Sequence, residues 1–285
     1  MKVVVVGAGR AGTAIAVLLR RAGHTIAAVN GRDATAERAA THLPGVAVLG
    51  PGDELPPADV VLIGVPDDRL ADTVAALATG IEPGTVVAHL SGASGLRVLT
   101  PAIEAGARGL AIHPLQTFAD VDGAIAALPG TVMAVTATDP AARAVGETIA
   151  NDLGARPVMV AEGDRATYHA AAVFASNDLV AITSVGEELL RAAGFQDPGG
   201  ALDPLQRATL DNVRRLGPDE ALTGPAVRGD AGTIEANLVA ISATAPGAVA
   251  LYVAACRVSL DIATRAGRLP PSSRTAVEEV LRRWS

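Results

Sequence analysis

The 285-residue chain is 49% hydrophobic and 19% charged, a composition typical of a globular protein with room for one large domain or two ordinary ones. Its formal net charge of −7 argues against nucleic acid as a partner, because binding a phosphate backbone needs a basic face. A single cysteine excludes an intramolecular disulfide, and no basic leader precedes the first strand, so we expect a cytoplasmic protein.

The first 160 residues alternate short β-branched runs with helical patterns, which is typical of a parallel sheet covered by helices. Strands are expected at Val3–Val6, Thr25–Val29, Val46–Leu49, Val60–Val65, Val86–Leu90, Leu110–His113, Thr131–Val135 and Pro157–Val160.

The first strand runs directly into a glycine-rich turn, "VVVVGAGRAG". Gly7, Gly9 and Gly12 give the G-x-G-x-x-G pattern between a strand and a helix, in which the glycines allow a tight turn, close approach of a pyrophosphate and close helix packing. The amino terminus of the helix, which includes Arg10 and Ala11, would hold the phosphates through its free N–H groups. The pattern predicts a dinucleotide site.

The end of the second strand, "VNGRD", indicates which dinucleotide binds. A site for NAD usually has an acidic residue here for the ribose 2′-hydroxyl, whereas this chain has Asn30 and Arg32. An arginine matches a 2′-phosphate, so we predict NADP as the cofactor, although Asp33 would restore an acid if the alignment shifted by one residue.

Two further strand ends belong to the predicted cofactor site. The fourth strand ends at Val65 and Pro66, in a turn that could lie against the ribose or the nicotinamide. The fifth ends at Ser91, at the carboxyl edge where open α/β sheets bind ligands. Ser91 could bind cofactor or substrate there, or it could simply cap a helix.

After Glu162 the hydrophobic pattern becomes helical, with helices expected over residues 165–194, 198–216, 231–244, 247–266 and 273–283. We therefore expect an α/β fold in which a doubly wound Rossmann-type sheet, residues 1–160, is followed by an all-helical domain, residues 161–285. The uncharged stretch 236–256 is interrupted at Pro246, which favours two buried helices over a membrane span.

A reductase needs a proton donor beside the carbon that accepts the hydride. The only lysine, Lys2, begins the first strand, which leaves the histidines as candidates, with Tyr168 and Tyr252 as weaker ones. His113 ends a strand and precedes a proline that fixes an extended exit, so a site role is expected for it, whereas His89 could be a core residue. No metal site is predicted.

The segment "YHAAAVFASN" supplies a second candidate, His169. On a helix, His169 and Ser176 lie along one stripe with Asn177 at its edge, among small apolar residues. Polar groups buried in such a helix would need partners, which a bound substrate could supply. The alternative is a hydrogen-bonded interdomain histidine without a catalytic role.

Six motifs, "GAGRAG", "GVPDDRL", "HLSG", "HPLQTF", "YHAAAVFASN" and "LTGPAVRGD", occur in the order seen in a bacterial family with a Rossmann-like domain followed by a helical domain of unknown function. The chain resembles this family over essentially its whole length. The family is similar to the superfamily with a 6-phosphogluconate-dehydrogenase type of helical domain, which includes ketopantoate reductase and pyrroline-5-carboxylate reductase.

The resemblance to ketopantoate reductase implies further site residues. His169 would replace that family's lysine, Val173 stands where it has an asparagine, and Asn177 matches a second asparagine. In "GPAVRGD", Arg228 could bind a carboxylate, and Asp230 could cap a helix or orient the side chain of Arg228. The resemblance also implies a homodimer formed through the helical half.

These observations predict an NADP-dependent oxidoreductase that reduces a small 2-oxo acid, with ketopantoate the first substrate to try. Asn177 and Ser176 would hold the substrate oxygens and His169 would deliver the proton. One alternative keeps the fold but reduces an imine or exchanges hydride with a deazaflavin. Another is a non-catalytic NADP-binding sensor, which would need no proton donor.

Overall fold

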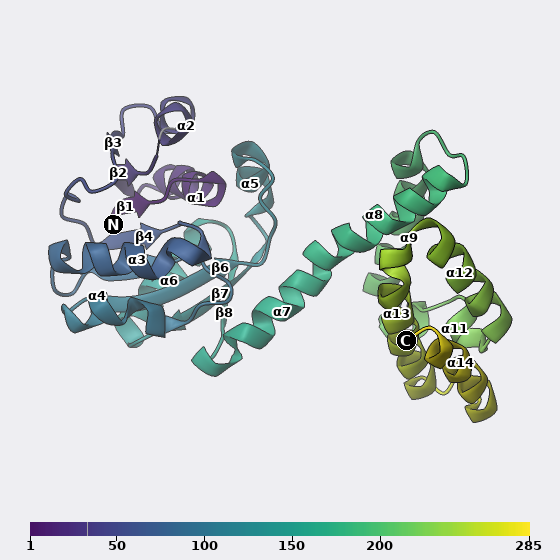
Figure 1. Cartoon of the computed structure of the whole chain (residues 1–285). Helices are drawn as coiled ribbons and strands as arrows, with labels where there is room; N and C mark the ends of the chain where they lie inside the picture. Colours follow the sequence, from purple (N-terminus) through teal and green to yellow (C-terminus); the bar gives the residue numbers. More distant parts are fainter. Residues whose placement is uncertain (33) are drawn as a thin grey trace. The chain divides into compact units, whose positions relative to one another are not determined.

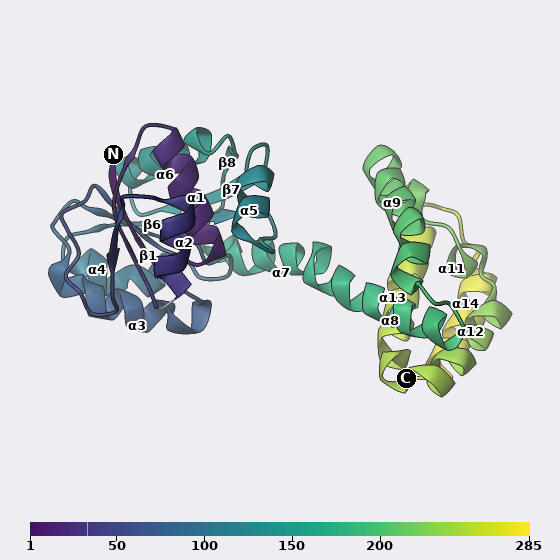
Figure 2. The same ribbon diagram turned by 90° about the horizontal axis from the view of Figure 1, so that it is seen from above.

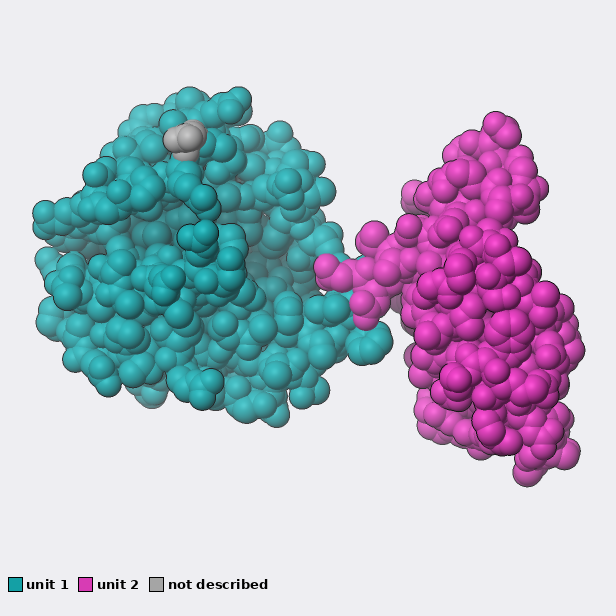
Figure 3. All heavy atoms as spheres, viewed as in Figure 1, with its two compact units in different colours: residues 1–176 teal, residues 177–285 magenta. Residues whose placement is uncertain are grey.

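The computed structural model describes residues 1–32 and 34–285, so Asp33 lies outside the described residues. The chain divides into two compact units, Met1–Ser176 and Asn177–Ser285 (Figure 3). The helical part of the chain begins with α7 (Arg165–Ala175), close to the boundary predicted at residue 160, but α7 is counted with the first unit because its first turn packs against the sheet.

The described part of the first unit forms an eight-stranded sheet in the order β3-β2-β1-β4-β5-β6-β7-β8 (Figure 1). Its strands are β1 (Lys2–Val6), β2 (Thr25–Asn30), β3 (Ala47–Leu49), β4 (Val60–Ile63), β5 (Val86–His89), β6 (Arg108–Pro114), β7 (Val132–Ala137) and β8 (Arg156–Met159). The first six run parallel, in the order of a doubly wound fold with its reversal between β1 and β4. The predicted α/β fold class is confirmed.

The last two strands differ from the expected parallel arrangement. β7 pairs antiparallel with β6, and β8 runs parallel to β7. The connection between β6 and β7 holds only the seven-residue helix α5 (Val121–Ala127), about 10 Å long, which is too short to return the chain along the whole sheet. β7 therefore starts near the edge at which β6 ends.

Alternating side chains of the strands build two apolar layers, one on each face of the sheet. Helices cover both faces (Figure 2). Val3 and Val5 face one layer, and Val4 and Val6 face the other. The first layer is covered by α1 (Arg10–Arg21), α2 (Ala34–His42), α5 and α6 (Pro140–Asp152), and the second by α3 (Asp67–Leu77) and α4 (Thr100–Glu104).

The second unit is helical throughout its described residues. Its helices are α8 (Asn177–Ala192), α9 (Pro198–Leu216), α10 (Pro218–Ala221), α11 (Pro225–Arg228), α12 (Ala231–Thr244), α13 (Val249–Arg265) and α14 (Pro271–Arg283). Its main core lies between α11, α12, α13 and α14 and includes Ile234, Leu260 and Val277. The continuous helix expected over 165–194 is instead broken at Ser176, whose φ and ψ are −127° and −75°.

The apolar stretch around residues 236–256 contains the predicted break. α12 ends at Thr244, and a short 3-10 turn from Pro246 to Ala248 leads into α13. Within the described residues, Pro246–Arg265 is one helical segment that by length and composition could cross a membrane, and 28% of that window is buried. The helix after the break, which was expected to be buried, is therefore only partly buried.

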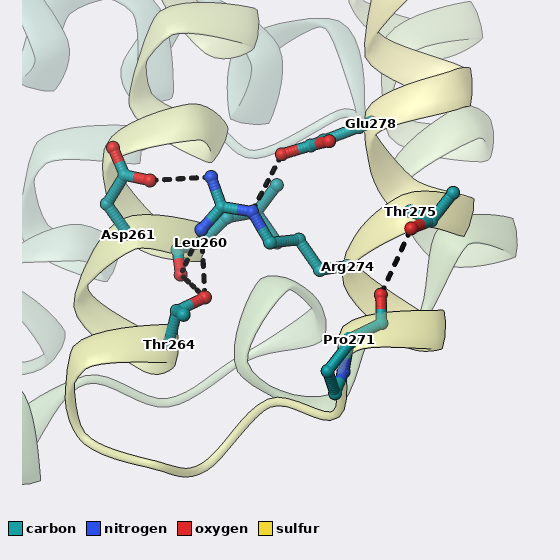
Figure 4. Close-up of polar contacts among 7 residues, drawn as sticks. All are labelled: Leu260, Asp261, Thr264, Pro271, Arg274, Thr275 and Glu278. Carbon is teal, nitrogen blue, oxygen red and sulfur yellow. Dashed lines mark hydrogen bonds and ion pairs between the residues drawn. The ribbon is translucent and has the colours of Figure 1, made fainter.

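Arg274 ties the last helix to its neighbour (Figure 4). Its guanidinium donates to Asp261 on α13 at 2.7 Å, to Glu278 one turn along α14 at 2.7 Å, and to Thr264 Oγ1 at 2.8 Å. Exposed ion pairs of this kind add little stability each, so the network mainly fixes the orientation of α14 on α13. No predicted site residue takes part in it.

Candidate functional site

The glycine turn after β1 has the geometry that its sequence predicts. Gly7 has φ +79°, and a Cβ there would lie 2.7 Å from the backbone nitrogen of Val65, at the end of the neighbouring β4. A Cβ on Gly12 would lie 2.8 Å from the Gly7 carbonyl oxygen. Both positions exclude any side chain, because the turn, the helix and the adjacent strand end are in contact there.

Gly9 has a different environment, because a Cβ there would meet no atom within 4 Å. Gly9 is the N-cap of α1, and no side chain caps this helix end. The first turn of an α-helix has free N–H groups and the positive end of the helix dipole. The open space beside Gly9 therefore suits an anionic group.

That space is part of a pocket of about 590 Å³ at the carboxyl ends of β1, β2 and β4. This is the reversal point of the strand order, where doubly wound sheets bind ligands. The predicted residues that line the pocket are Gly7, Gly9, Asn30, Arg32, Val65 and Pro66. Arg10, Ala11 and Gly12 lie in the adjacent first turn of α1, and Ser91 lies elsewhere.

Arginines dominate the charge of this pocket. Among its described lining residues are Arg32, Arg38 and Arg69, together with the carboxylates Asp53 and Asp72. Arg38 is a residue that the sequence analysis missed: its Nε donates to the carbonyl oxygen of Ala8, at 2.9 Å, within the glycine turn itself. The sequence held one indication, because Arg38 is a second arginine shortly after Arg32, on the first helix after β2. Only the fold shows that the Arg38 side chain points back to the glycine turn.

Asn30 has a structural contact that its prediction as a cofactor residue did not include. Its side-chain amide donates to the Gly50 carbonyl oxygen at 2.6 Å, and the Gly50 N–H donates to Asp53 at 2.7 Å. Asn30 thereby joins the end of β2 to the loop after β3. Arg32 is exposed beside it, at the mouth of the pocket.

A second group of polar residues lies on one face of β5, β6 and β7. Leu110 and Ile112 of β6 face the apolar layer under α1, so the alternate residue His113 faces the opposite side. The same alternation turns His89 of β5 and Thr136 of β7 to that side. The first turn of α7 covers them with Arg165, Tyr168 and His169, all from within the first unit.

His89 is the hydrogen-bonded core residue that the sequence analysis allowed for. It is 0% exposed, its Nδ1 accepts from the Ser91 N–H at 3.2 Å, and its Nε2 lies 3.0 Å from the Gly95 carbonyl oxygen. The proton therefore sits on Nε2. Burial lowers the pKa of His89 to about 4, so the ring is uncharged at neutral pH.

His113 is paired with Tyr168. Its Nδ1 lies 2.8 Å from the Tyr168 hydroxyl oxygen, within hydrogen-bond distance. Burial, and then the positive charge of Arg165, lower the pKa of His113 to about 4. Burial also raises the pKa of Tyr168. At neutral pH this is therefore a pair of uncharged groups, and His113 does not carry the proton of an imidazolium acid.

His169 lies beside His113, with ring centroids 6.0 Å apart and the rings nearly perpendicular. A Cβ on Gly92 would lie 2.5 Å from Nδ1 of His169 and 2.9 Å from Nε2 of His113, so the two nitrogens converge on this glycine. Among the described residues, the buried Nδ1 of His169 has no hydrogen-bond partner. His113 and His169 both belong to the first unit.

Arg165 is the second residue that the sequence analysis missed. It is 1% exposed, and its guanidinium donates to the Ser91 carbonyl oxygen at 2.6 Å and to Thr136 Oγ1 at 3.1 Å. In the sequence it looks like an ordinary charged residue at a helix start. Its burial depends on the meeting of three distant segments, which no local pattern reveals.

Ser91 acts here as a turn residue. Its Oγ accepts from the Ser94 N–H at 2.9 Å within the loop, and it caps no helix, because the next helical turn begins at Leu96 with Gly95 as its N-cap. Glu162, just before α7, accepts from the Leu96 N–H at 2.8 Å through both carboxylate oxygens. The loop after β5 is thus held by Arg165 at one end and by Glu162 at the other.

The remaining predicted residues lie at or beyond the end of the first unit. Ser176 is its last residue, and Asn177 is the exposed first residue of α8 in the second unit. Asp230 caps α12 by accepting from the Thr233 N–H at 3.0 Å, as the capping alternative stated. Arg228 is exposed at the end of α11.

The second unit has an apolar pocket of its own, of about 640 Å³, between α8, α12 and α13. Its polar feature is a pair in which the Asn237 amide donates to the Tyr252 hydroxyl oxygen at 2.8 Å. No predicted site residue lines this pocket. Its larger volume therefore does not make it the candidate site, because the groups capable of chemistry lie in the first unit.

Comparison with protein families identifies two domains. Residues 1–114 match the Rossmann-like domain, and residues 131–258 match a domain of unknown function, DUF2520. This confirms the predicted pairing of a Rossmann-like domain with a domain of unknown function. The second match begins before β7, so it includes the two strands that run against the other six.

Among solved structures, a Bacteroides fragilis protein assigned as an NADP oxidoreductase is 25% identical over 91% of this chain and 98% of its own, with a TM-score of 0.77. A Thermotoga maritima protein is 20% identical over 93% and 100%, with a TM-score of 0.71. The imine reductase of Myxococcus stipitatus, in complex with NADP+, is 18% identical over 100% and 99%, with a TM-score of 0.65. Among curated proteins no sequence matches significantly.

Proposed function

We propose that this protein is an NADP-dependent oxidoreductase that reduces a small 2-oxo acid. The observation that carries the proposal is the pocket beside Gly9, where an uncapped helix start and several arginines meet at the reversal of the strand order. The likeness to the B. fragilis protein assigned as an NADP oxidoreductase supports the same reading.

The residues of this pocket fit NADP. The open space beside Gly9 and the start of α1 would receive the pyrophosphate. Arg32 and Arg38 would hold the 2′-phosphate, because guanidinium groups bind phosphate through paired N–H donors. Asn30 would act indirectly, by keeping the loop after β3 in place.

When bound, the reduced nicotinamide supplies a hydride, and the chain must supply a proton to the oxygen of the carbonyl. We assign the proton to His169, which has a buried nitrogen without a partner among the described residues. His113 would remain uncharged beside it and would hold the Tyr168 hydroxyl. Asn177, Ser176 and Arg228 remain proposed contacts to the substrate's oxygens and carboxylate.

The electrostatics of the histidine face favour a carbonyl over an imine as substrate. His89 and His113 both have a pKa lowered to about 4, and the buried guanidinium of Arg165 lies among them. Reduction of a carbonyl develops negative charge on oxygen, which the positive charge of Arg165 beside the histidines would stabilise, whereas that charge would repel a cationic iminium. Imine reduction stays the alternative, as the fold shared with an imine reductase would allow.

The loss of NADPH absorbance should be followed with a panel that holds ketopantoate, other small 2-oxo acids, cyclic imines and a deazaflavin. We expect turnover with at least one 2-oxo acid and none with the imines or the deazaflavin. Turnover confined to imines or deazaflavin would replace this proposal by the alternative. NADPH binding without turnover of any member would favour the non-catalytic sensor.

A further inference from the structure

We propose that Arg165 is a positioning residue, which fixes the first turn of α7, and with it Tyr168 and His169, against the loop after β5. The inference deepens the proposed function, because it explains how the groups assigned to proton transfer are held. Its structural part depends on the first unit alone.

The contacts of Arg165 join three segments that are distant in the sequence. One guanidinium nitrogen donates to the Ser91 carbonyl oxygen at 2.6 Å, and another donates to Thr136 Oγ1 on β7 at 3.1 Å. Thr136 in turn donates to the Val160 carbonyl oxygen at 2.6 Å, at the end of β8. The guanidinium therefore links the loop after β5, strand β7 and the helix that carries it.

Because of the helical spacing, the contacts of Arg165 also fix the positions of Tyr168 and His169. Tyr168 and His169 follow Arg165 by three and four residues, so all three side chains lie on one face of α7. Beyond this turn the helix has little support from the first unit, as the 75% exposure of Phe174 shows. Where His169 and Tyr168 lie relative to His113 and Gly92 is thus set mainly by the first turn.

The guanidinium has an unusual setting for a buried charge. Arg165 forms no salt bridge with a carboxylate among the described residues, and its Nε has no hydrogen-bond partner there. A buried cation that is held only by uncharged acceptors is costly. Burial lowers the pKa of Arg165, and Tyr168 when ionised and then Glu162 act in the opposite direction. A residue kept purely for packing would not need this charge.

The charge acts on the imidazoles that it faces. Besides burial, the positive charge of Arg165 lowers the pKa of His113, as does His169 or His89 when either is protonated, and the charge of Asp67 at the start of α3 raises it. Arg165 is the largest of these charges in its effect, so it helps to keep His113 an uncharged partner of Tyr168 at neutral pH.

The decisive experiment is a titration of the histidine resonances by NMR between pH 8 and pH 5, which needs neither cofactor nor substrate. His113→Gln identifies the His113 signal. In the wild type this signal should not titrate in the range, whereas in Arg165→Met it should begin to titrate, with a pKa above about 4 but below 6.5 because burial remains. Arg143→Met, which removes an exposed charge paired with Glu147, should leave the signal as in the wild type.

Arg165→Lys keeps the positive charge but removes the planar guanidinium with its paired N–H donors. It should leave the His113 titration close to that of the wild type but should lower kcat about 10²-fold through displacement of His169, with KM for NADPH unchanged. If Arg165→Met does not fold, Arg165→Lys decides alone, through a lowered kcat with an unchanged KM for NADPH. The proposal is overturned if Arg165→Met leaves the His113 signal unmoved, or if Arg165→Lys keeps the kcat of the wild type. Should no substrate be found, the proposed function fails while the titration still decides the role of Arg165.

Discussion

At the scale of single residues, the three glycines of the first turn differ in whether the fold has room for a side chain. Gly7 and Gly12 are required by the fold itself, because a Cβ at either would meet the backbone of a neighbouring segment. Gly9 is not required by the fold, since a Cβ there would enter open space. The open space at Gly9 is what the proposed pyrophosphate site requires.

Gly9→Ala should therefore leave the protein folded while it weakens NADPH binding about tenfold or more, because the added methyl group occupies the space for the pyrophosphate. Calorimetric titration measures the affinity, and thermal unfolding checks the fold. Gly80→Ala is the matched control, because a Cβ at Gly80 also meets no atom within 4 Å. Equal NADPH affinities for wild type and Gly9→Ala would mean that the open space is not the phosphate site.

The buried His89 and the partly buried His113 should make stability depend on pH. The pKa of His89 and of His113 is lowered from 6.5 to about 4 in the folded protein, so between these values the unfolded chain binds protons that the native protein does not. Stability should then fall as the pH is lowered from 7 to 5, by about 1–2 kcal/mol for each histidine. Urea unfolding at both pH values measures this change, and His89→Gln should reduce it by about half. An unchanged dependence in that variant would refute the assignment.

At the scale of elements, the sequence predicted the strands and most helices well because their hydrophobic periods are local. The direction of β7 and β8 was not predictable in this way, since it depends on the length of the connection through α5 rather than on any strand pattern. The break at Ser176 was missed because the sequence before it is Ala-rich and the apolar pattern continues after it, so that both sides favour helix. Arg165 and Arg38 were missed because their contacts lie with segments far away in the sequence.

The turn between β2 and α2 should decide the preference for NADP. Arg32→Ala should weaken NADPH binding by about 1.5–3 kcal/mol and leave NADH binding unchanged, because only the former has a 2′-phosphate. Arg38→Ala should weaken both, since Arg38 also holds the Ala8 carbonyl oxygen of the glycine turn. Calorimetry with both cofactors separates the two roles. Equal affinity of the wild type for NADPH and NADH would contradict the predicted preference.

At the scale of the whole molecule, the two units differ in what they contain. The first unit alone brings together the glycine turn, the arginines and the histidine face. The second unit contributes Asn177 and Arg228 by proposal only, and its apolar helices α8, α9 and α13 have exposed side chains such as Val180, Leu205 and Val258. The sequence could anticipate the content of both units, but it could not show that His169 belongs with the first.

The exposed apolar side chains of the second unit favour the proposed homodimer. We expect light scattering on the purified protein to give twice the mass of a single chain, because such side chains gain by burial against a second copy. Val258→Glu on α13 should shift the equilibrium toward the single chain, whereas Ala254→Glu, at another exposed position of the same helix, tests whether the effect is local. A wild type with the mass of one chain at all concentrations would rule the homodimer out.

The most direct measurement of the central claim is turnover by wild type and His169→Ala with NADPH and the 2-oxo acid found to be a substrate, combined with calorimetry of NADPH binding. General acid catalysis contributes about 10²–10⁴-fold, so His169→Ala should lose about that factor in kcat. Its NADPH affinity should stay that of the wild type, because the pocket beside Gly9 does not include His169. If His169→Ala keeps the kcat of the wild type, the histidine face does not supply the proton and the proposed mechanism is wrong.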